Sequence, residues 1–197
     1  RCVGVILAGG GATRFGGEPK GLRVVEGARM IDRVAGALRE ATDELLLVAN
    51  DPGAAAWLPG TPTVGDVRTG EGALGGLHAA LSHARGLPVL VVAWDMPFVP
   101  AGLLRALRAL GEAGADAAVA ESESSGRGVE PLCAWYGPSC LAAIERRLDA
   151  GDRRVVGFFE DVRVSRLPAA AVSQYGESAR IFFNVNFPGD LSLAFPP

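Results

Sequence analysis

Residues 3–21 read VGVILAGGGATRFGGEPKG, a hydrophobic run that leads directly into a glycine-rich segment. The run is rich in β-branched residues and ends at glycine, which is typical of a buried strand. The glycines allow positive φ angles and close approach to a ligand, and successive backbone N–H groups can face an anion. Arg14 and Lys20 add positive charge, so the segment predicts a strand followed by a loop that binds a polyphosphate.

The spacing of the glycines argues against two common phosphate-binding motifs. A GxGxxG pattern cannot be drawn from Gly9, because its third glycine would fall on Arg14. Gly16 and Gly21 have the spacing of a Walker A motif, but Leu22 stands where that motif needs lysine. The loop therefore differs from those of dinucleotide-binding dehydrogenases and P-loop NTPases.

Strand-like and helix-like segments alternate along the rest of the chain. Because the strand-like segments are hydrophobic on both faces, we expect a parallel sheet covered by helices. Right-handed crossovers then predict a three-layer, Rossmann-like α/β fold, with a mostly parallel sheet, helices on both faces and one domain over residues 1–197. Further strands are expected at residues 44–50, 88–95, 115–120, 132–136 and 162–167 and near Val64, and helices at 30–41, 73–84, 100–113 and 138–150.

Three polar residues follow the expected parallel strands: Asn50, Asp66 and Asp95. Ligands of open α/β sheets bind beyond the carboxyl ends of the strands, so these residues and the glycine-rich loop should meet in one site. Asp95 is suited to Mg²⁺, which usually takes one or two protein carboxylates together with substrate phosphates. Asp95 could instead be a helix N-cap or a turn residue, and Asp66 could form a turn.

Composition excludes several classes of protein. The formal net charge is -3 without a basic cluster, so no nucleic-acid partner is expected. The longest apolar run, residues 88–94, is too short to cross a membrane, and no signal-peptide pattern is found, so we expect a cytoplasmic protein. The three cysteines form no CxxC pair and should be buried, whereas His78 and His83 are expected at the surface or beside a site.

Residues 7–21 resemble the LAGG-x-x-x-R-[MF]-G-x-x-x-K-G signature of the molybdenum cofactor guanylyltransferase family of nucleotidyltransferases. The resemblance continues along the chain in the same order as in the family. The further matching segments are VAND (48–51), GALGG (72–76), WDMPFVP (94–100), LDAGDRRV (148–155) and FNVNFPGDL (183–191).

This resemblance implies transfer of GMP from GTP to molybdenum-bound molybdopterin, with release of pyrophosphate. It implies an N-terminal half that binds nucleotide and a C-terminal half that binds the acceptor, with cofactor-delivery proteins as possible further partners. Asp95 would hold Mg²⁺, Arg14 and Lys20 would stabilise the leaving pyrophosphate, and Asn184 and Asn186 would lie on the acceptor side. The nucleotide-contacting positions would be Leu7, Ala8, Gly9, Gly10, Lys20, Asn50 and Asp66.

Some positions depart from the family pattern or allow another interpretation. Ala73 replaces a proline, and Glu130 replaces a histidine on the acceptor side. Asn184 and Asn186 could serve as turn residues before a helix beginning at Pro188, and Arg153 and Arg154, which resemble a pterin-binding pair, could be solvated charges. The alternative functions are a relative that uses CTP or another phosphorylated acceptor, and a non-catalytic nucleotide-binding regulator.

Overall fold

A seven-stranded sheet with the order β5-β4-β1-β6-β8-β7-β9 is the centre of the computed structural model, which describes residues 1–9, 19–123, 125–186 and 190. Four strands run parallel side by side: β5 (Thr63–Val64), β4 (Glu44–Val48), β1 (Val3–Leu7) and β6 (Val89–Ala93). β8 (Val129–Tyr136) is antiparallel to both β6 and β7 (Ala117–Glu121), and β9 (Val164–Leu167) is parallel to β7. The parallel half of the sheet therefore brings the carboxyl ends of four strands to one edge.

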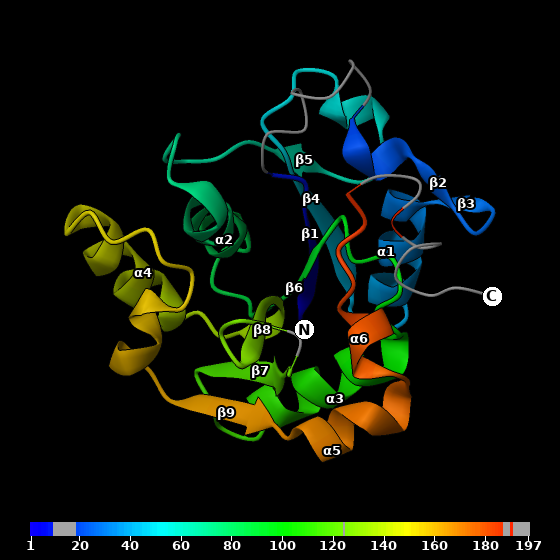
Figure 1. The fold of residues 1–197 in the computed structure, drawn as a ribbon. Coiled ribbons are helices and arrows are strands. Elements are labelled where there is room, and N and C mark those ends of the chain that lie inside the picture. Colours follow the sequence, from blue (N-terminus) through cyan, green and yellow to red (C-terminus); the bar gives the residue numbers. More distant parts are fainter. Residues whose placement is uncertain (10–18, 124, 187–189, 191–197) are drawn as a thin grey trace.

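Helices cover both faces of this sheet, as Figure 1 shows. α1 (Met30–Arg39) and α3 (Ala101–Glu112) pack on one face, where Ile6 and Leu47 point into the same core. α2 (Gly72–His83) and α4 (Cys140–Asp149) pack on the other face, against Val5 and Leu46. Successive strand residues point to opposite faces, so strands that are apolar throughout supply both cores.

The α/β architecture predicted from the sequence is confirmed, with shifts of a few residues at the element ends. The shorter elements were not predicted, because segments of two to five residues carry no hydrophobic period. These are η2 (Lys20–Leu22), β2 (Val24–Val25), β3 (Ala28–Arg29), η3 (Ala54–Ala56), η4 (Gly157–Asp161), α5 (Ala169–Val172), η5 (Ser173–Tyr175) and α6 (Ser178–Ile181). The helix expected from Pro188 lies outside the described residues.

The cysteines and histidines follow the expectation only in part. Cys2, Cys133 and Cys140 are buried free thiols, as predicted. His83 is exposed, but His78 is 3% exposed, because it lies on the face of α2 that α4 covers. Its Nε2 lies 3.4 Å from Oε1 of Glu145 on α4. Among the described residues, we find no helix with the length and apolarity needed to cross a membrane.

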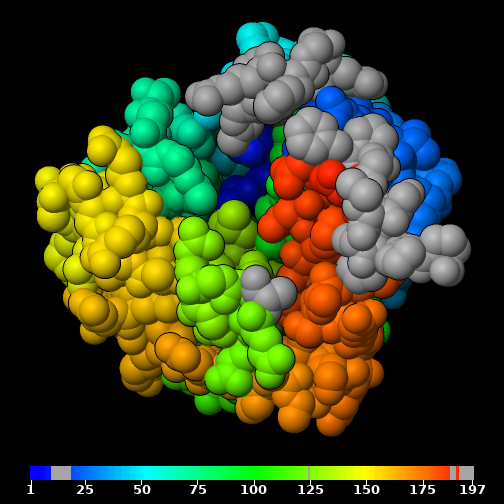
Figure 2. Space-filling view, in the orientation of Figure 1, coloured from blue at the N-terminus to red at the C-terminus, as the bar shows by residue number. Residues whose placement is uncertain are grey.

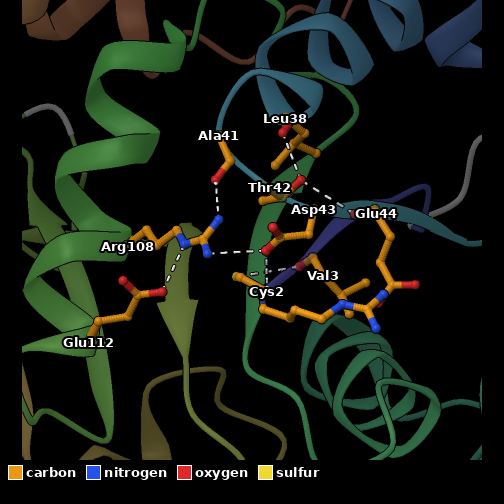
Figure 3. Close-up of polar contacts among 10 residues, drawn as sticks. Cys2, Val3, Leu38, Ala41, Thr42, Asp43, Glu44, Arg108 and Glu112 are labelled. Carbon is orange, nitrogen blue, oxygen red and sulfur yellow. Dashed lines mark hydrogen bonds and ion pairs between the residues drawn. The ribbon is translucent and has the colours of Figure 1, made fainter.

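A polar network fixes the amino-terminal end of β1 against α1 and α3 (Figure 3). The backbone N–H of Cys2 donates to Oδ2 of Asp43 at 2.7 Å, and a terminal guanidinium nitrogen of Arg108 lies 3.1 Å from the same oxygen. Arg108 also donates to the carbonyl oxygen of Ala41 and to Glu112. The hydrogen bond from Cys2, assisted by Arg108, lowers the pKa of Asp43 below its ordinary value of 3.8.

Replacing Asp43 by Asn should reduce the free energy of unfolding at pH 7. The pKa of Asp43 is lower in the folded state, so its charge stabilises the fold above pH 3.8, and this contribution is lost as the pH falls below that value. The free energies of unfolding of wild type and Asp43→Asn, measured in urea, should therefore differ at pH 7, and the difference should shrink as the pH falls below 3.8. Glu40→Gln, which removes an exposed pair with Arg105 at 3.5 Å, is the control with the smaller expected effect. Equal stabilities of Asp43→Asn and wild type at pH 7 would contradict this account.

Candidate active site

A cavity of about 390 Å³ opens at the carboxyl ends of the four parallel strands. Its walls come from the residues that follow β1, β4, β5 and β6, from the start of α2 and from Leu132 of β8. In Figure 2 this region is a hollow at the centre of the face, with the dark-blue first residues of the chain at its floor. The lining residues are Leu7, Ala8, Gly9, Val48, Ala49, Asn50, Asp66, Gly70, Gly72, Ala73, Gly76, Ala93, Trp94, Asp95 and Leu132.

Lys20 and Asp95 meet at this cavity, although 75 positions separate them in the chain. The Lys20 ammonium donates to Oδ2 of Asp95 at 2.8 Å and to Oδ1 of Asn186 at 2.6 Å. The Lys20 and Asp95 side chains are 18% and 22% exposed, so the pair is only partly hydrated. α3 begins after Pro100, so Asp95 does not cap that helix; it lies in the turn that follows β6.

Close packing of the backbone against Trp94 places Lys20. A Cβ atom on Gly21 would lie 2.2 Å from Cε3 of Trp94, so only glycine fits at that position. The Trp94 ring is buried and stacks on Trp57 with ring centroids 5.3 Å apart. The glycine next to Lys20 therefore has a packing role as well as the conformational role inferred from the sequence.

The segment 184–186 closes one side of the site. The backbone N–H of Val185 donates to the carbonyl oxygen of Asp95 at 3.0 Å, and the Val185 side chain is buried beside Val25 and Met30. This burial leaves the flanking Asn184 and Asn186 exposed. The backbone of Asn186 also accepts a hydrogen bond from Arg23 at 3.2 Å and donates to Asp190 at 2.7 Å.

Asn50 and Asp66 form a reciprocal pair on the other side of the cavity. The Asn50 amide donates to Oδ2 of Asp66 at 2.7 Å, and its Oδ1 accepts from the Asp66 backbone N–H at 2.7 Å. Asp66 is thus fixed to the end of β4 and is more than a simple turn former. The structure brings Leu7, Ala8, Gly9, Asn50, Asp66 and Asp95 into one cavity wall. Lys20 is joined to this wall through Asp95, and Asn186 is joined through Lys20.

Glu130 places another carboxyl group near Asp95. Burial raises the pKa of Glu130 above its ordinary value of 4.5, and the negative charge of Asp95 raises it further. A hydrogen bond with Ser125 and the charge of Arg127 oppose this increase. The position that departs from the family pattern is therefore a partly buried carboxyl group on β8, and burial is the main cause of its raised pKa.

Arg153 and Arg154 have different partners in the structure. Nε of Arg153 donates to Glu71 at 2.6 Å, in the loop before α2, whereas Arg154 pairs with Asp152 in its own turn. Arg14 and Gly10 lie outside the described residues. Sequence reasoning missed the contacts of Arg23 and the wall formed by Trp94 and Leu132, because these depend on tertiary packing.

A cavity lined by polar residues at the carboxyl ends of parallel strands, in an α/β fold, is typical of one class of protein, the nucleotidyltransferases. Residues 4–165 match the family model described as the MobA-like NTP transferase domain. The chain belongs to this family.

Full-length relatives agree with this assignment. The chain is 39% identical over 98% of its length to the probable molybdenum cofactor guanylyltransferase of Pelotomaculum thermopropionicum, covering 92% of that protein. It is 32% identical to the molybdenum cofactor guanylyltransferase of Desulfosudis oleivorans, over 98% of this chain and 93% of that protein. The crystal structure of molybdopterin-guanine dinucleotide biosynthesis protein A from Archaeoglobus fulgidus matches with a TM-score of 0.78 and 30% identity, over 98% of this chain and 96% of that one.

Replacing Gly21 by Ala should destabilise the protein by about 1–3 kcal/mol, because the new methyl group has no room beside Trp94. Thermal and urea unfolding measure this effect. Gly36→Ala is a matched control: it lies in α1, where no atom comes within 4 Å of the position that a Cβ would take, and should be neutral or stabilising. Wild-type stability in Gly21→Ala would show that the packing against Trp94 is not a constraint.

Proposed function

We propose that the protein transfers GMP from GTP to molybdenum-bound molybdopterin, producing molybdopterin guanine dinucleotide and pyrophosphate. The observation that carries this proposal is the Lys20–Asp95 contact at a cavity of nucleotide-binding type. Membership of the family and the activities named for its full-length relatives support the choice of substrates.

The nucleotide is proposed to occupy the cavity beside β1 and β4. Leu7, Ala8 and Gly9 would contact it from the end of β1, and Asn50 and Asp66 from the ends of β4 and β5. The amino-terminal residues of α2 also line this cavity, and the partial positive charge of a helix N-terminus favours a phosphate group. On the basis of the sequence, Gly10 and Arg14 are proposed as further phosphate contacts.

The reaction is an attack by the terminal phosphate of molybdopterin on the α-phosphorus of GTP. A bond forms between the attacking phosphate oxygen and the α-phosphorus, and the bond from the α-phosphorus to the oxygen that bridges to the β-phosphate breaks. The electron pair of the broken bond leaves with pyrophosphate. Because the attacking phosphate is already an anion near neutral pH, the site has to supply alignment and charge stabilisation more than a general base.

Asp95 is the proposed magnesium ligand. In the part of the chain that the structure describes, no group of three or more His, Cys, Asp or Glu side chains could hold a metal ion by itself. A single carboxylate fits Mg²⁺, which commonly takes its remaining ligands from substrate phosphates and water. When bound, Mg²⁺ would neutralise charge on the reacting phosphates.

Lys20 is proposed to stabilise the negative charge that develops on pyrophosphate. Its ammonium group, held between Asp95 and Asn186, is already close to the proposed phosphate position. A triphosphate carries more negative charge than these partners, so the ammonium can exchange them for phosphate oxygens without becoming unpaired. Asn184 and Asn186, in the segment beside Asp95, are proposed to face the acceptor.

Replacing Asp95 by Asn should reduce pyrophosphate release from Mg²⁺–GTP and molybdenum-loaded molybdopterin by about 100- to 1,000-fold, the effect expected for one charge-stabilising group. The shape of the side chain is retained, so circular dichroism and thermal unfolding should show a folded protein. Asp161→Asn is the control, because this carboxylate pairs with Arg147 on α4 at the surface. Near-normal turnover by folded Asp95→Asn would contradict the assigned role.

A further inference from the structure

The loop 65–71 between β5 and α2, together with the first residue of α2, contributes three residues to the wall of the cavity: Asp66, Gly70 and Gly72. Gly70 and Gly72 have φ angles of 80° and 61°, in the left-handed region. Glycine-rich backbone has many accessible conformations, so contacts with other parts of the protein must select the shape of this loop. The Asn50–Asp66 pair fixes only its first part.

Two ion pairs connect the remainder of the loop to the last residue of α4 and to the turn that follows it. A terminal nitrogen of Arg68 lies 2.6 Å from Oδ1 of Asp149, and Nε of Arg153 lies 2.6 Å from Oε2 of Glu71. The two pairs have opposite polarity: the loop supplies the positive charge of one and the negative charge of the other. Sliding the loop along the turn would bring like charges together, so this arrangement favours one register.

Buried packing between α2 and α4 fixes the position of α4, which carries or precedes the partners of both pairs. Leu74, Leu77 and Leu81 of α2 share one hydrophobic core with Ile144 and Leu148 of α4. His78 extends the contact, with Nε2 at 3.4 Å from Glu145. The two helices lie side by side in Figure 1. The side chain of Glu71 is only 18% exposed, although Arg153 is 61% exposed.

We propose that Arg68 and Glu71 are positioning residues for the nucleotide, acting through Asp149 and Arg153. They hold Asp66, Gly70 and Gly72 in the shape that receives GTP, without contacting the nucleotide themselves. This inference rests on the proposed function, because it takes the cavity to be the GTP site. If these residues position the nucleotide, GTP affinity depends on the turn after α4, where Arg153 lies 82 positions beyond Glu71 in the chain.

A charge exchange between Glu71 and Arg153 tests this proposal. The dissociation constant of Mg²⁺–GTP is measured by titration calorimetry, without acceptor, for wild type, Glu71→Arg, Arg153→Glu and the double variant. Each single change replaces an attractive pair by a repulsive one and should weaken GTP binding about fivefold or more, the effect of losing about 1 kcal/mol. The double variant restores opposite charges and should bind within about twofold of wild type.

Two further measurements separate positioning from general damage. Arg163→Glu removes an ion pair of similar exposure in another part of the fold, with Asp116, and should leave GTP affinity unchanged. In steady-state assays the single variants should raise KM for GTP more than they lower kcat, because the reacting groups are not changed.

The outcomes are distinguishable. If wild type does not bind Mg²⁺–GTP, the proposed function itself fails. If wild type binds but folded single variants bind equally well, or if the double variant binds no better than the weaker single variant, the positioning role of these pairs is overturned.

Discussion

The contact of the Lys20 ammonium with Asp95 and Asn186 joins three distant parts of the chain. Lys20 follows the glycine-rich segment, Asp95 follows β6, and Asn186 belongs to the segment beyond α6. The ammonium balances the charge of a partly buried carboxylate and also holds the segment 184–186 beside it. The proposed transfer chemistry depends on this junction, because it gathers a cation, the proposed metal-binding carboxylate and the proposed acceptor-side amide at one place.

The order of strands makes this junction possible. β1 lies between β4 and β6, so the residues after these three strands share one edge of the sheet. Right-handed crossovers place α1 and α2 on opposite faces, and each helix covers one of the two cores. α2 then points its amino-terminal residues at the cavity, while α4 supports it from the other side. In this account α4 and the turn after it, in the C-terminal half that is proposed to bind the acceptor, also fix part of the wall of the nucleotide cavity.

Much of this arrangement was predictable from local patterns. Apolar strands that each end before a polar residue predicted the shared edge and the convergence of Asn50, Asp66 and Asp95. The antiparallel direction of β8 was not predicted. The connection from β7 to β8, residues 122–128, is too short to hold a crossover helix and so favours antiparallel pairing. The burial of His78 was not predictable from its spacing to His83, because it depends on which face of α2 packs against α4. The partners of Lys20 and Arg153 likewise required the tertiary structure, since 75 and 82 positions separate them from Asp95 and Glu71.

The most direct test of the central claim is the identity of the product. The wild-type protein is incubated with Mg²⁺, molybdenum-loaded molybdopterin and either GTP, CTP or ATP, and the products are analysed by mass spectrometry. The account predicts the guanine dinucleotide from GTP, with one pyrophosphate released for each molecule formed, and little product from the other two nucleotides. A preference for CTP, or no dinucleotide from any of the three, would contradict it.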